Sequence, residues 1–205
     1  MSHVKRPTET MRSNWMMPAA LVAALLCTPA VAQQTKFAPT TTLAGKTLVL
    51  NGAGTRYRTV VKVYDLALYV PQKATSREAI LAQKGPFRVR LVALRDIDAG
   101  DIGRAMVVGM RDNTDPEQAY RLARYTSKII EIFSADSRIA TGTQFGLDWV
   151  PGKGADFYLD GKLIGQISDA EFIEPFLSIW IGQAPADHRL KDRLLGLNNQ
   201  PALAN

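Results

Sequence analysis

Alternation between apolar and polar residues predicts a series of β-strands. In the clearest case Val89 and Leu91 would lie on one face of a strand and Arg88 and Arg90 on the other, as in a half-buried strand. The pair Asp160-Gly161 favours a hairpin between the last two apolar stretches. The strands predicted in this way cover residues 46–50, 55–70, 87–95, 143–150, 156–159 and 162–167.

Apolar residues at helical spacing, combined with capping residues, predict helices between these strands. The strongest start signal is Asp115-Pro116-Glu117-Gln118, which has a capping Asp, a Pro at the first helical position and a Gln three residues after the cap. Pro175 should kink the fourth helix or split off its first turn. The predicted helices cover residues 76–82, 98–110, 115–134, 170–181 and 187–195.

The order of these elements is strands, helices, strands and helices, which predicts an α+β domain. Its sheet should be large, mostly antiparallel and covered by helices on one face. We expect a turn at 51–54 and a break near Arg58 within the long strand signal that follows. The predicted domain spans 44–196, after a flexible leader at 33–43 and before a C-terminal tail at 197–205.

The first 32 residues have the organisation of a signal peptide. Lys5, Arg6 and Arg12 precede an apolar run at 16–26, and Ala30-Val31-Ala32 matches a cleavage site. The run is shorter than the roughly 20 apolar residues that span a membrane, and no later stretch resembles such a span. We therefore expect a periplasmic or secreted protein that is cleaved after Ala32 and has no integral membrane segment.

Two alternatives to a signal peptide remain open. A disordered tail would leave the apolar run unexplained, and a lipoprotein signal would use Cys27, although Leu26 is bulky where such signals take a small residue. Cleavage after Ala32 removes the only cysteine, three of the 25 Lys/Arg and one of the 19 Asp/Glu, which leaves 173 residues with a net charge of +4. This size suits one domain with a sizeable core. The mild charge, without a Lys/Arg-rich run, excludes a typical nucleic-acid-binding protein.

After position 32 the chain lacks the residues that most hydrolytic, redox and metal sites require. His188 is the only histidine there, and no G-x-S-x-G sequence occurs. A zinc site would have to rest on carboxylates, which is unusual for zinc. Gly52-x-Gly54 lacks the third glycine of a dinucleotide-binding loop and is followed by a strand signal. The sequence thus predicts no metal and no cofactor.

Arg56 is the most informative residue that remains. It lies among apolar and tyrosyl neighbours, where a guanidinium group either reaches water or binds an anion. A structural ion pair with Asp65 or Asp148 is the alternative to ligand binding.

Four sequence motifs, in this order, resemble the chalcone isomerase family. They are NGAGTR at 51–56, KVYDLALY at 62–69, WVPG at 149–152, and IWIG at 179–182 followed by residues 187–196. The similarity covers about residues 44–196 and is greatest to the bacterial chalcone-isomerase-like branch. It implies an open-faced β-sandwich, in which a large antiparallel sheet and a helical layer enclose a cleft.

The resemblance implies two possible activities, and Arg56 matches the arginine used in both. Plant members close a chalcone to a flavanone without a cofactor, by attack of a phenolate oxygen on an enone. Fatty-acid-binding members hold an acyl chain in the corresponding cleft, with the arginine on the carboxylate. A related branch has been associated with haem, for which only Tyr64 or Tyr69 would be conceivable axial ligands here.

The polar catalytic positions of the plant enzymes are not matched. Those on the helix fall on Ile102, Ala105 and Gly109, the late threonine or serine falls near Ile179, and the strand threonine falls on Tyr64. Loss of one oxyanion donor costs on the order of a hundredfold in rate. The sequence therefore favours binding over cyclisation.

We predict an exported, non-catalytic protein that binds a fatty acid or a similar apolar carboxylate. Arg104 would be a second cation near the mouth, and Met106 and Met110 would be adaptable packing, unless both are plain core. An intramolecular lyase and a structural envelope protein, its cleft filled by its own side chains, remain alternatives. The oligomeric state is open. The predicted ligand-binding residues are Arg56, Tyr64, Tyr69, Arg104, Met106 and Met110.

Overall fold

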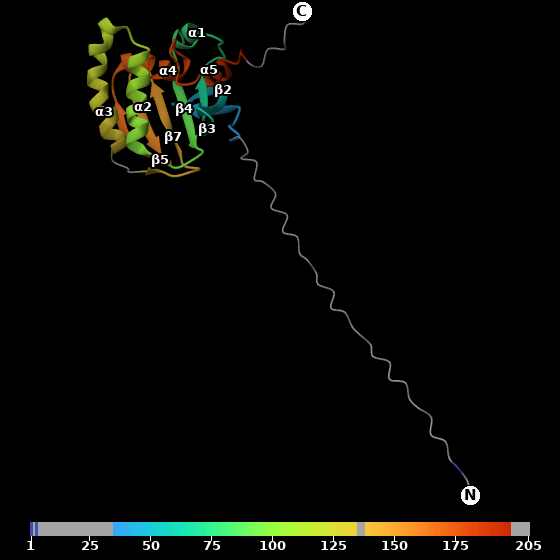
Figure 1. Ribbon diagram of the computed structural model, residues 1–205. Helices are drawn as coiled ribbons and strands as arrows, with labels where there is room; N and C mark the ends of the chain where they lie inside the picture. The colour runs from blue at the N-terminus through green and yellow to red at the C-terminus, as the bar shows by residue number, and fades with distance from the viewer. Residues whose placement is uncertain (2, 4–34, 135–137, 198–205) are drawn as a thin grey trace, which may run out of the picture. The chain divides into compact units, whose positions relative to one another are not determined.

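The computed structural model describes residues 1, 3, 35–134 and 138–197, and a seven-stranded antiparallel sheet dominates them (Figure 1). The expected signal peptide lies outside the described residues except for Met1 and His3, and so does the expected tail after residue 197. The sheet order is β1-β2-β3-β4-β7-β8-β9, and β5 and β6 form a separate two-stranded pair. The strands are β1 Thr40–Leu43, β2 Lys46–Arg58, β3 Val61–Val70, β4 Phe87–Ala93, β5 Ile97–Asp98, β6 Arg138–Ile139, β7 Gln144–Val150, β8 Gly154–Leu159 and β9 Lys162–Ile167.

Helices cover one face of this sheet, so the predicted α+β fold class is confirmed (Figure 1). The break predicted near Arg58 is the turn between β2 and β3. The helices are α1 Arg77–Leu81, α2 Ala99–Asp112, the 3₁₀ helix η1 Pro116–Leu122, α3 Ala123–Ser134, the 3₁₀ helix η2 Ala170–Phe172, α4 Ile173–Ile181 and α5 His188–Leu194.

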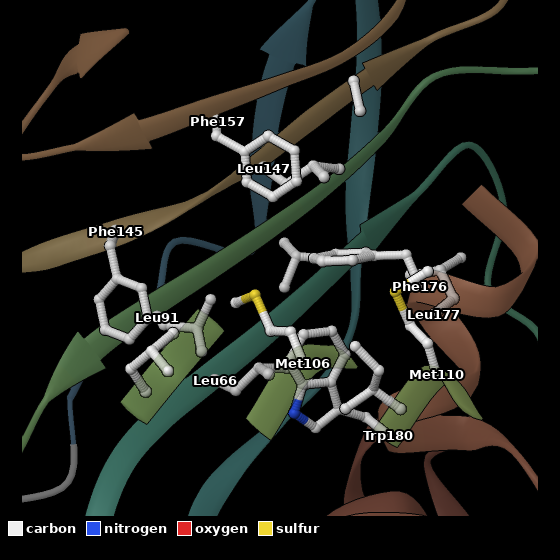
Figure 2. Packing of buried hydrophobic residues seen from close by; sticks show 14 of the residues in the cluster. Leu66, Leu91, Met106, Met110, Phe145, Leu147, Phe157, Phe176, Leu177 and Trp180 are labelled. Atoms are coloured by element: carbon white, nitrogen blue, oxygen red, sulfur yellow. The ribbon is translucent and has the colours of Figure 1, made fainter. Parts of the chain in front are cut away.

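The period-two pattern places one apolar row per strand under the helices. Leu66 of β3 pairs with Leu91 of β4, while Leu147 of β7 pairs with Phe157 of β8, and all four are buried. Figure 2 shows these side chains packed with Met106 and other residues from the helices. Because each buried methylene contributes about 0.8 kcal/mol, this single core accounts for most of the hydrophobic stabilisation.

The 51–54 stretch is not a turn, contrary to the sequence-based expectation. β2 runs through it, with a bulge between Leu50 and Gly52. Helix α5 lies directly on the glycines, since a Cβ added at Gly52 would be 2.0 Å from the carbonyl oxygen of Arg193. The Asn51 side chain donates to the carbonyl oxygen of Leu194 at 2.6 Å. The glycines are required here for close helix–strand contact.

Three further elements refine the expectations. Part of the segment predicted as a flexible leader is ordered, because β1 pairs with β2 and Leu43 packs beside Tyr69 on the outer face of the sheet. The helix predicted at 115–134 begins as the 3₁₀ helix η1 and becomes α-helical only at Ala123. The first turn before Pro175 is split off as η2, as predicted, which leaves Pro175 in the first turn of α4, where its missing N–H is tolerated.

Replacement of Gly52 by alanine should detach α5 from β2. The added methyl group would overlap backbone atoms of Arg193 and Leu194, which cannot move away as a side chain could. We expect Gly52→Ala to lower the free energy of unfolding in urea by about 3 kcal/mol or more. Gly100→Ala is the control, because its methyl group would meet only side-chain atoms of Asp98 and Arg104, at 3.1 Å and 3.2 Å, and no backbone. Equal midpoints for Gly52→Ala and the wild type would contradict this packing.

Candidate functional site

Arg56 lies near the end of β2, opposite Tyr64 of β3, at a bulge between Arg56 and Tyr57. Its guanidinium carbon lies 5.6 Å from the centre of the Tyr64 ring, in cation–π range. The Nε atom is buried without a hydrogen-bond partner. Among the described residues, no carboxylate lies within 4 Å of this guanidinium group.

The two structural partners considered for Arg56 are engaged elsewhere. Asp65 accepts hydrogen bonds from the Thr55 hydroxyl at 2.5 Å and from the backbone N–H of Thr35 at 2.7 Å. Asp148 pairs with Arg88 at 2.7 Å and with Arg90 at 3.0 Å on the outer face of the sheet. The alternative of a structural ion pair with either aspartate is therefore wrong.

A small cavity of about 20 Å³ lies beside Arg56, between the sheet and helices α2 and α4. Arg56 and Tyr64 supply its polar groups, with the indole of Trp180. In Figure 2, Met106 and Trp180 lie next to each other in the core that closes the cavity. The other lining residues are apolar: Leu91, Ile102, Ala105, Met106, Phe145, Ile179 and Ala186.

Tyr64 is the second polar group of the site. Its hydroxyl oxygen accepts a hydrogen bond from Trp180 Nε1 at 2.8 Å, and its side chain is buried. Burial raises the pKa of the Tyr64 hydroxyl above its ordinary value, although the positive charge of Arg56 opposes this. The phenol therefore stays protonated and has its own O–H to donate to an anion beside Arg56.

The arrangement suits recognition of a carboxylate better than cyclisation. Ile102, Ala105 and Ile179 all line the cavity, as the resemblance to the family implied, and none of them carries a side-chain donor. Gly109 lies against Ile179, since an added Cβ would be 2.9 Å from a methyl carbon of Ile179. A developing enolate would find Arg56 and the Tyr64 hydroxyl, but no donor at the helix positions from which such chemistry also takes them.

Three of the six predicted site residues come together and three do not. Arg56, Tyr64 and Met106 line the cavity. Met110 is buried in the same core without lining the cavity.

The placement of Tyr69 at this cleft is wrong, and Arg104 does not line the cavity. The Tyr69 hydroxyl donates to the carbonyl oxygen of Ala38 at 3.0 Å on the outer face of the sheet. Residues 64 and 69 are five positions apart, and strand alternation alone assigns them to opposite faces. The Arg104 side chain is 64% exposed and pairs with Asp98 and Asp101. Trp180, the partner of Tyr64, was not among the predicted site residues.

Comparison with known proteins decides the family. A family model described as chalcone isomerase-like matches residues 30–196, most of the chain. The chain belongs to the chalcone isomerase-like family. A crystal structure of the fatty-acid binding protein AtFAP1 from Arabidopsis thaliana is similar, with a TM-score of 0.61 and 14% identity over 78% of this chain and 90% of that one. No curated protein matches the sequence.

These findings confirm the predicted chalcone isomerase-like fold, while an identity of 14% establishes the fold alone. No helix in the described part of the chain is long and apolar enough to cross a membrane. Within residues 35–134 and 138–197, no three His, Cys, Asp or Glu side chains gather as a metal site would require.

The Tyr64–Trp180 hydrogen bond should be measurable in this chalcone isomerase-like protein. Tyr64→Phe leaves the indole N–H of Trp180 buried without an acceptor, so we expect the free energy of unfolding in urea to fall by about 1–3 kcal/mol. Tyr57→Phe is the control. The Tyr57 side chain is exposed, so the loss of its hydroxyl group should change the free energy of unfolding by less than about 0.5 kcal/mol. Equal stabilities for the two variants would show that the bond contributes nothing.

Proposed function

We propose that this protein binds a fatty acid or a similar apolar carboxylate without transforming it, and that Arg56 anchors the carboxylate. The observation that carries the proposal is the half-buried Arg56 that lines an apolar cavity, with its Nε atom buried and without a hydrogen-bond partner and with no described carboxylate within 4 Å. A guanidinium group holds a carboxylate through two parallel hydrogen bonds, each contributing about 1.5–3 kcal/mol. The Tyr64 hydroxyl would donate a third. The fatty-acid binding activity named for the similar Arabidopsis protein supports the same class of ligand.

The acyl chain would need more space than the structure provides. A cavity of about 20 Å³ is far below the roughly 300–1,000 Å³ of typical ligand sites. Met106 is the side chain best suited to give way, because methionine is unbranched and rotates about three bonds. The acyl chain would occupy its volume, with a small shift of α2 away from the sheet. At about 0.8 kcal/mol per buried methylene, a twelve-carbon chain offsets the cost of association and reaches roughly micromolar affinity.

A structural protein without a small ligand is the second candidate. The same small cavity favours it, because the side chains of the protein already fill the cleft. Against it stands Arg56, whose buried Nε atom has no hydrogen-bond partner, since a buried polar atom with a purely structural role usually has one. An intramolecular lyase has less support, because Ile102, Ala105 and Ile179 line the cavity without a side-chain donor.

Native mass spectrometry of the protein isolated from the cells that make it tests the anchor. We expect the wild type and Arg104→Ala to carry a carboxylic lipid and Arg56→Ala to lose it, because only Arg56 lines the cavity. Bare protein in the wild type, or a ligand that survives in Arg56→Ala, would refute the proposal. We further propose export with cleavage after Ala32. The same masses test that step, and a chain that retains residues 1–32 would refute it.

Two methionine variants test whether the cavity can open. Met106→Ala and Met110→Ala remove equally buried side chains, and each should lower the free energy of unfolding by about 2–5 kcal/mol. Only Met106 lines the cavity, so only Met106→Ala should bind dodecanoate several-fold more tightly than the wild type in calorimetric titrations. Methyl dodecanoate, which lacks the charge, should bind neither variant well. If neither the wild type nor Met106→Ala binds dodecanoate, the structural alternative is correct.

A further inference from the structure

The turn between β2 and β3 concentrates exposed apolar side chains. Three of the eight large apolar residues that are exposed in the described chain lie here: Tyr57 is 40% exposed, Val60 84% and Val61 44%. Thr59, within the same turn, has a φ of 59°, a left-handed conformation that is rare for a β-branched residue. A strained, outward-facing apolar turn is costly in water and indicates a contact surface.

Unpaired cations surround this turn. Arg58 and Lys62 flank the exposed valines, and neither forms an ion pair with a carboxylate in the described residues. Residues 57–62 contain no acidic side chain. The carboxylate of Asp187 contacts this segment, because it accepts a hydrogen bond from the backbone N–H of Tyr57 at 2.9 Å. Asp187 also caps α5. Its charge is thus partly offset by backbone donors.

The turn also adjoins the Arg56 cavity. Arg56 directly precedes Tyr57 in β2, and Ala186, which lines the cavity, directly precedes Asp187. The exposed residues and Arg56 are therefore neighbours along the same strand.

We propose that residues 57–62 dock this protein on an anionic lipid surface, from which an apolar carboxylate passes to Arg56. Exposed apolar side chains enter the boundary between headgroups and acyl chains, and neighbouring cations stay among the phosphates. Each Lys or Arg near such a surface strengthens binding about fivefold. The transfer step rests on the proposed function, whereas docking requires only the turn. Charge complementarity favours an anionic bilayer over an uncharged one.

Co-sedimentation with lipid vesicles tests the docking step. The full chain is mixed at low salt with phosphatidylglycerol-containing vesicles or with pure phosphatidylcholine vesicles. We expect the wild type to bind the anionic vesicles, and Val60→Asp to bind them about tenfold more weakly, because it removes an inserting side chain and adds a repelled charge. Leu163→Asp, at a 51% exposed residue of β9, is the matched control and should bind like the wild type.

A second pair of variants tests the charge. Lys62→Glu should weaken binding to the anionic vesicles, whereas Lys46→Glu, at the opposite end of β2, should not. The docking proposal would be overturned if the wild type did not sediment with anionic vesicles, or if Val60→Asp sedimented like the wild type.

The docking and ligand-binding proposals can fail separately. Arg56→Ala should lose the carboxylic ligand and still sediment with anionic vesicles. Val60→Asp should bind dodecanoate in solution with unchanged affinity, yet take it up from vesicles more slowly than Leu163→Asp. Equal uptake rates in these two variants would overturn the transfer step.

Discussion

Direct packing of α5 on β2 is the constraint on which the site depends. Two glycines leave the β2 surface bare, and Asn51 ties the strand to the end of the helix through the Leu194 carbonyl oxygen at 2.6 Å. The position of α5 in turn fixes Asp187, which holds the backbone of Tyr57. Arg56, which precedes Tyr57 and pairs with Tyr64, thereby lines the cavity under the helical layer while its side chain stays half-buried.

The site combines a cation that lacks a partner with a cavity that is too small for a ligand. Arg56 lies over the Tyr64 ring and lacks a hydrogen-bond partner at Nε, which is unfavourable in a region of low dielectric. Met106 lines the same cavity, and in the proposed function a ligand would take up its space. A methionine side chain can fill a cavity and move out of it again, because it packs well yet changes rotamer at little cost. The small cavity and the arginine without a partner are therefore compatible with the same binding event, in which the ligand would displace Met106 and pair with Arg56.

Much of the fold was predictable, because its strands alternate and its helices carry strong caps. The 51–54 stretch failed because Asn-Gly-Ala-Gly is locally typical of a turn, whereas the glycines serve a helix more than 130 residues away in sequence. The candidate site, too, was predictable only in part. Arg56 was singled out by its apolar and tyrosyl neighbours and by the resemblance to the family, and Tyr64 by that resemblance. The absence of a carboxylate partner for Arg56 and the size of the cavity depend on long-range packing that no local pattern encodes.

The outer face of the sheet shows why the state of Arg56 is informative. There Asp148 raises the pKa of Arg88 through a hydrogen bond, and it also pairs with Arg90, whose pKa burial lowers. One aspartate thus offsets the charge of two partly buried arginines on that face. No described carboxylate does the same for Arg56 on the inner face, although Asp65 lies on the adjacent strand and points to the other side. Because strand alternation separates the two residues, the inner face retains a positive charge that an anion from outside can neutralise.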